Sequence, residues 1–159
     1  MSVNVHTAPS STNTTHRSRC LWLKFKAKTL LVFGLRAKAH EVFEEILSIN
    51  QNDVLALNSL GYEHLNNGRL TQAHSFFERV LVQTPNNANA HFNVGFVLEE
   101  LARSLEAEKA FKAAIQIDPK MDRAWYGLGL VLVRQRRLEE SLMAFKRNTE
   151  LQSMSPFAW

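Results

Sequence analysis

The sequence predicts an all-α protein built from tandem helix-turn-helix units, and three observations carry this prediction. The chain repeats itself at a spacing of 34 residues. Each repeat holds two stretches in which apolar residues recur every three or four positions, as in a helix that buries one side. Glycine or proline follows these stretches, as is typical where a helix ends. A period of this length indicates a tandem repeat of small structural units.

The repeat is visible as columns of identical or similar residues 34 positions apart. The columns are Gly61, Gly95 and Gly129; Phe43, Phe77, Phe111 and Phe145; Ala39, Ala73, Ala107 and Ser141; Pro85 and Pro119; Gly34 and Gly68; and Leu23, Leu57, His91, Trp125 and Trp159. Several columns of different residue types that share one period are hard to produce by chance.

The clearest hairpin is predicted from two helices over residues 54–67 and 70–83. Asp53 stands before the first helix as an N-cap, and Gly68 supplies a left-handed end to it. Pro85 ends the second helix, because proline cannot continue a helix interior.

The same pattern of apolar residues and helix ends predicts further helices over 89–101, 106–117 and 139–151, and an earlier one over 20–33. A glycine inside a helix costs about 1 kcal/mol relative to alanine, so the glycine column implies close packing. The residues expected to pack against it are Ala73, Ala107 and Ser141.

Both ends of the chain depart from the repeat. Residues 1–19 are rich in Ser, Thr and Asn, which predicts a disordered tail, with an organellar transit peptide as the alternative. The array is expected over 20–155, in repeats at 20–53, 54–87, 88–121 and 122–155, and residues 156–159 look like the start of a fifth. The first forty residues carry seven Lys or Arg and no acid.

Composition and motifs give no sign of catalysis. The single cysteine, Cys20, excludes an internal disulfide and a cysteine-based zinc site. The six glycines form no phosphate-binding loop, and neither a nucleophile elbow nor a zincin motif occurs. His64 and His91 could approach each other as a metal pair, but packing histidines are the preferred interpretation. We therefore expect no enzyme activity, no metal, no cofactor and, without a secretory signal, a cytoplasmic protein.

The columns resemble the tetratricopeptide repeat family. The resemblance covers about residues 20–155 and implies a right-handed superhelical solenoid of about four repeats. It also implies a concave groove, lined by the first helix of each repeat, in which peptides commonly bind. The groove residues carried over through the columns are Lys24, Lys28, Asn58, Tyr62, Asn89, Phe92, Phe96, Glu99, Arg123 and Tyr126.

Some members of this family clamp the terminal carboxylate of a peptide with lysine, asparagine and arginine. Lys24 matches that pattern, but Lys28, Tyr62, Phe92 and Phe96 replace its other members. A chaperone-tail adaptor is therefore disfavoured, and an apolar or amphipathic peptide is the expected ligand.

The favoured function is a non-enzymatic module that binds a peptide or protein partner. One alternative is a peripheral adaptor that touches anionic membrane or nucleic acid through the basic residues 17–38. Another is a non-catalytic part of a larger enzyme or secretion component. Exposed apolar residues of the last helix also predict self-association through the C-terminal end.

Overall fold

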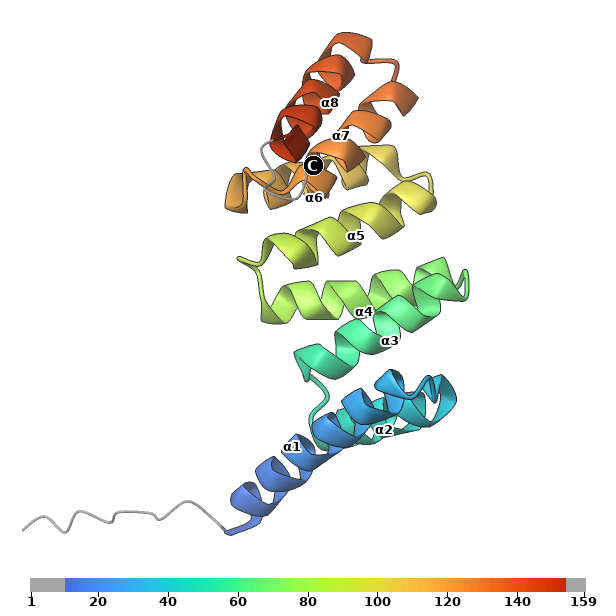
Figure 1. The fold of residues 1–159 in the computed structure, drawn as a ribbon, viewed down its shortest axis with the longest axis vertical. Coiled ribbons are helices and arrows are strands. Elements are labelled where there is room, and N and C mark those ends of the chain that lie inside the picture. Colours follow the sequence, from blue (N-terminus) through green and yellow to red (C-terminus); the bar gives the residue numbers. More distant parts are fainter. Residues whose placement is uncertain (1–10, 154–159) are drawn as a thin grey trace, which may run out of the picture. The chain divides into compact units, whose positions relative to one another are not determined.

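The computed structural model describes residues 11–153 and consists there of eight helices, with no strand among the described residues (Figure 1). The helices are α1 (Ser11–Val32), α2 (Arg36–Ile49), α3 (Val54–Asn66), α4 (Leu70–Gln83), α5 (Ala88–Glu100), α6 (Ser104–Ile117), α7 (Asp122–Arg134) and α8 (Leu138–Ser153). The all-α prediction is confirmed. The chain forms two compact units, which divide between Ala56 and Leu57, within α3.

In the N-terminal unit α1 packs against α2. The residues that the two helices bury are Leu23 and Ala27 from α1, and Ala39, Val42, Phe43, Ile46 and Leu47 from α2. The buried Asp53 accepts a hydrogen bond from the backbone N–H of Ala56 at 3.2 Å. This bond confirms Asp53 as the predicted cap of the next helix.

The first helix begins earlier than the sequence predicts. Residues 11–19 were expected to belong to a disordered tail, but α1 starts at Ser11. A helix can extend beyond its apolar stripe because its backbone bonds are local, and Arg19 on the added stretch forms an ion pair with Glu45 of α2 at 2.5 Å. Residues 1–10 of the predicted tail, and the start of a fifth repeat at 156–159, lie outside the described residues.

In the C-terminal unit each helix packs against the next, in the order α4, α5, α6, α7 and α8. The centre of its core is formed by the fully buried rings of Phe77 and Phe111 together with Val97 and Val131. The helix bounds agree with the predicted ranges to within two residues.

The glycine column packs against phenylalanine, which corrects the expected contact with Ala73, Ala107 and Ser141. A Cβ added at Gly61 would meet the ring of Phe77 at 2.8 Å, and one added at Gly129 would meet Phe145 at 2.6 Å. Of the small residues of the second helix, Ser141 lies close to the glycine column, because its hydroxyl donates a hydrogen bond to the Gly129 carbonyl at 3.0 Å. The ring is large and flat, so only a residue without a Cβ allows it to approach the helix backbone.

A left-handed residue ends the first helix of every repeat. Gly34 and Gly68 have φ of +72° and +70°, and the sequence predicts this conformation for Gly68. One and two periods further on, Ala102 and Arg136 adopt the same conformation with φ of 59° and 60°. These two residues carry a Cβ where the backbone favours glycine, so the turns of the last two repeats are strained.

Candidate partner-binding face

Eight of the predicted groove residues lie in the C-terminal unit, on the first helices of three successive repeats. Asn58 and Tyr62 come from α3, Asn89, Phe92, Phe96 and Glu99 from α5, and Arg123 and Tyr126 from α7. We call this surface of α3, α5 and α7 the first-helix face. Lys24 and Lys28 belong to the N-terminal unit and are treated with it.

Three aromatic side chains of the first-helix face are exposed. Tyr62, Phe96 and Tyr126 expose between 38% and 51% of their surface. Each rests on another ring: Tyr62 on Phe77 at 5.1 Å between centroids, Phe96 on Phe92 at 6.2 Å, and Tyr126 on Phe145 at 5.7 Å. Each of the three rings thus packs against another ring of the protein, while part of its surface stays open to solvent.

Polar contacts join the three helices of this face. The Tyr62 hydroxyl donates to Oδ1 of the buried Asn93 on α5 at 2.8 Å. Arg123 of α7 donates to the Asn89 side chain, and its guanidinium lies 4.5 Å from the centroid of the Phe92 ring. Arg123 therefore stays close to the face as a cation stacked on an aromatic ring.

Glu99 does not offer a free charge to a ligand, although the sequence places it in the groove. It is only 6% exposed and forms an ion pair with Arg134 of α7 at 2.6 Å. Arg134 is the last residue of α7. Its position, one period plus one residue after Glu99, is the signal that could have indicated this pair.

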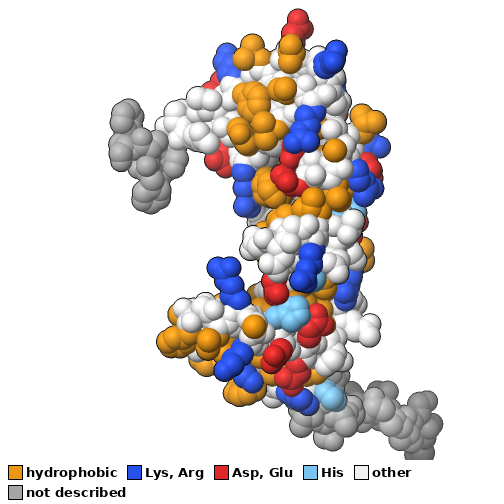
Figure 2. Space-filling view, turned by 90° about the vertical axis from the view of Figure 1, so that its right-hand side faces the viewer, with side chains coloured by type: hydrophobic (Ala, Val, Ile, Leu, Met, Phe, Trp, Pro, Cys, Tyr) orange, Lys and Arg blue, Asp and Glu red, His pale blue; other side chains and the backbone are white. Residues whose placement is uncertain are grey.

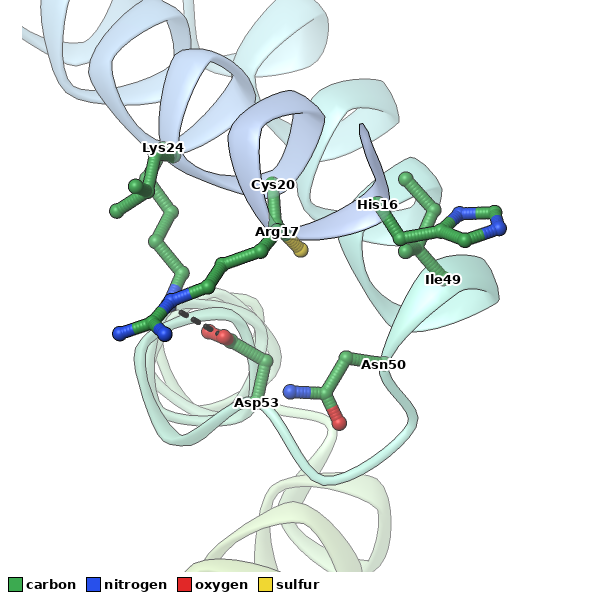
Figure 3. A pocket seen from close by; sticks show the side chains of 8 residues that line it. His16, Arg17, Cys20, Lys24, Ile49, Asn50 and Asp53 are labelled. Atoms are coloured by element: carbon green, nitrogen blue, oxygen red, sulfur yellow. Dashed lines mark ion pairs between the residues drawn. The ribbon is translucent and has the colours of Figure 1, made fainter. Parts of the chain in front are cut away.

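The two lysines predicted from the first repeat have different surroundings. Lys28 is exposed on α1, whereas the ammonium group of Lys24 lies 2.5 Å from the Asp53 carboxylate. Figure 3 shows Lys24 directed at Asp53 beside Arg17, Cys20 and His16 of α1, with Ile49 and Asn50 opposite. These side chains line a cavity of about 430 Å³ whose buried carboxylate is already paired. Lys24 is thus engaged within its own unit.

His64 and His91 make packing and hydrogen-bond contacts, in agreement with the preferred interpretation of these histidines. The His91 Nε2 lies 2.9 Å from the Pro85 carbonyl, and one period later the Trp125 ring nitrogen donates to the Pro119 carbonyl at 2.9 Å. His64 stacks on Phe76 at 5.3 Å. Among the described residues no cluster of three or more His, Cys, Asp or Glu side chains could hold a metal ion.

The model of the tetratricopeptide repeat family matches the chain at residues 26–88, 58–122 and 95–147. Together these matches span residues 26–147, which is most of the sequence and reaches all three repeats of the C-terminal unit. The chain belongs to the tetratricopeptide repeat family. Its repeats identify it as a scaffold of the kind that mediates protein interactions.

Solved structures of MamA share this fold. One crystal structure of MamA has a TM-score of 0.77 at 22% identity, over 84% of this chain and 78% of that one. A MamA fragment from Desulfovibrio magneticus RS-1 gives 0.75 at 22% identity, over 84% and 76%. A double mutant of MamA RS-1 gives 0.77 at 21% identity, over 93% and 89%. At these identities the likeness establishes the tetratricopeptide repeat fold, and no curated protein sequence matches the chain.

Across residues 11–153 no helix has both the length and the apolar character that crossing a bilayer requires. Figure 2 shows that hydrophobic side chains nevertheless reach the surface in several places, including the C-terminal hairpin of α7 and α8 and the first hairpin of α1 and α2. This tetratricopeptide repeat protein therefore exposes apolar side chains on several parts of its surface.

Proposed function

We propose that the first-helix face binds an apolar or amphipathic peptide segment of a protein partner. The observation that carries this proposal is the row of exposed rings, Tyr62, Phe96 and Tyr126, on three successive first helices. Rigid aromatic side chains provide large contact areas at small entropic cost, and they are enriched among the residues that dominate binding energy.

The charges of the face agree with an apolar ligand. Glu99 is neutralised by Arg134, and Arg123 is stacked on Phe92 and hydrogen-bonded to Asn89. A clamp for a terminal carboxylate needs several converging cations. In this chain aromatic residues occupy most of the corresponding positions. Binding here should therefore weaken only modestly as the salt concentration rises, unlike polyanion binding.

Selection from a displayed library of random peptides tests this function. The recovered peptides should be rich in apolar residues, and F96A combined with Y126A should abolish their binding. L105A is the matched control, because Leu105 is an exposed apolar residue on the second helix of the same repeat as Phe96. Peptides that bind the double variant as well as the parent would exclude the first-helix face.

We also infer that α8 pairs with a second copy of the chain. Leu142 and Met143 expose between 64% and 70% of their surface, and they share one side of the helix with the exposed Glu139 and Lys146. In an antiparallel pair related by a two-fold axis, Glu139 of one copy would face Lys146 of the other. The same surface is thus complementary to itself in charge and offers apolar side chains at its centre.

A further inference from the structure

Helix α1 has two apolar sides, of which the hairpin uses only one. Leu23 and Ala27 are buried against α2, and each is at most 1% exposed. Leu21, Trp22, Phe25 and Val32 lie on the other side and expose between 59% and 82% of their surface. Packing within the hairpin therefore does not account for these four large side chains, which we call the outer stripe.

The outer stripe is continuous along the helix. At about 100° per residue, Leu21, Phe25 and Val32 fall within about 40° of one another, and Trp22 lies beside them. Lysines flank both edges, with Lys28 next to Leu21 and Lys26 next to Trp22. The ammonium group of Lys26 lies 5.3 Å from the centroid of the Trp22 ring.

The charged residues of α1 itself all have the same sign. Helix α1 carries no acidic residue, and the first acid of the chain is Glu41 on α2. Two basic residues of α1 are occupied by partners, Arg19 with Glu45 and Lys24 with Asp53. Arg17, Lys26 and Lys28 are exposed and remain available to an anionic surface.

We propose that the outer stripe of α1 lies on the surface of an anionic lipid membrane. A row of leucine, valine, phenylalanine and tryptophan flanked by lysines matches the helices that lie in the plane of a bilayer interface. The apolar side chains would enter the acyl boundary while Lys26 and Lys28 contact lipid phosphates. The hairpin need not open, because the side chains that hold it together lie on the opposite side of α1.

The same chemistry argues against nucleic acid as the occupant. Single-stranded nucleic acids are bound by stacking aromatic rings within a basic groove. Here the stripe includes the aliphatic Leu21 and Val32, which cannot stack on bases but suit hydrocarbon. This interaction is independent of the proposed peptide binding, which uses α3, α5 and α7.

Flotation of the full chain with lipid vesicles tests this proposal. The protein should bind vesicles of phosphatidylcholine with phosphatidylserine, and bind vesicles of phosphatidylcholine alone much more weakly. K26E combined with K28E should weaken binding at least about tenfold. L21S combined with F25S should abolish binding to the vesicles. V82S, at an exposed valine of α4, should leave this binding unchanged.

Tryptophan fluorescence supplies a readout that a general attraction of charges would not give. Binding should shift the emission to shorter wavelength, and W22F should remove that shift while most of the binding is retained. All substituted residues are exposed or half-exposed, so circular dichroism should show unchanged helix content. Failure to bind anionic vesicles, equal binding to neutral ones, or tighter binding to poly(dT) than to the vesicles would overturn the proposal.

Discussion

The ring of Phe111 lies so close to Gly95 that a Cβ added at Gly95 would come within 3.0 Å of it. The same ring would meet a Cβ at Gly127, on the first helix of the next repeat, at 2.6 Å. One phenylalanine is thus packed between two glycines of successive first helices. This contact explains why the repeat keeps a glycine inside a helix, where alanine would be favoured by about 1 kcal/mol.

G95L should therefore lower the free energy of unfolding by at least about 1–3 kcal/mol through overpacking. Urea unfolding followed by circular dichroism measures this loss. In the background of F111L the cost should be smaller, because the shorter side chain leaves room. A G95L protein as stable as the parent would show that the contact between Gly95 and Phe111 is not tight.

The strained turns predict two stabilising substitutions. A102G and R136G should each raise the free energy of unfolding by about 0.5–1 kcal/mol, because glycine removes the left-handed strain at a smaller entropic cost. A113G, within α6, is the control and should lower it by about 1 kcal/mol. If A102G destabilised the protein as much as A113G does, the positive φ at position 102 would not be strained.

A buried carboxylate predicts a pH dependence of stability. Burial alone would raise the pKa of Glu108, but hydrogen bonds from Lys112, Gln135 and Arg137 outweigh it and lower the pKa from 4.5 to about 2. A lowered pKa stabilises the fold above pH 4.5, and this contribution is lost as the pH falls from there toward 2.

E108Q should thus cost about 1–3 kcal/mol at pH 6 and progressively less toward pH 2, as unfolding at several pH values would measure. E106Q serves as the control, since Glu106 is exposed and its partner Arg103 lies on the surface. A cost for E108Q that stays constant from pH 6 to pH 2 would contradict the proposed ionisation.

Pairing of α8 can be tested by exchanging charges. The parent should associate as its concentration rises in sedimentation equilibrium, and E139K should weaken this association by placing like charges opposite each other. E139K combined with K146E should restore it, because the exchange re-creates opposite charges across the two-fold axis. A parent that stays monomeric at high concentration, or a double variant no better than E139K, would rule out the pair.

Most of the fold could be predicted from the period of 34 residues. It gave the positions of the helices, the left-handed Gly68 and the cap Asp53, because these depend on local chemistry. Extending the column of Gly34 and Gly68 by one and two periods would also have indicated Ala102 and Arg136.

Pairings between repeats were harder to predict. The sequence did not indicate that Glu99 is buried against Arg134, nor that phenylalanine fills the space beside the glycine column. A spacing of one period plus one residue makes Arg134 a candidate partner of Glu99, but the rotation of the two helices against each other decides whether such side chains meet. Tyr62, Phe96 and Tyr126 are exposed, whereas Lys24, which was predicted for the same groove, is occupied by Asp53.

The central claim is that the exposed rings of the first-helix face hold a peptide. An NMR titration of the isotope-labelled protein with a peptide selected from the display library tests it most directly. We predict that the largest chemical-shift changes fall on α3, α5 and α7, at and around Tyr62, Phe96 and Tyr126. Changes concentrated on α4, α6 or α8, with these three residues unaffected, would contradict the claim.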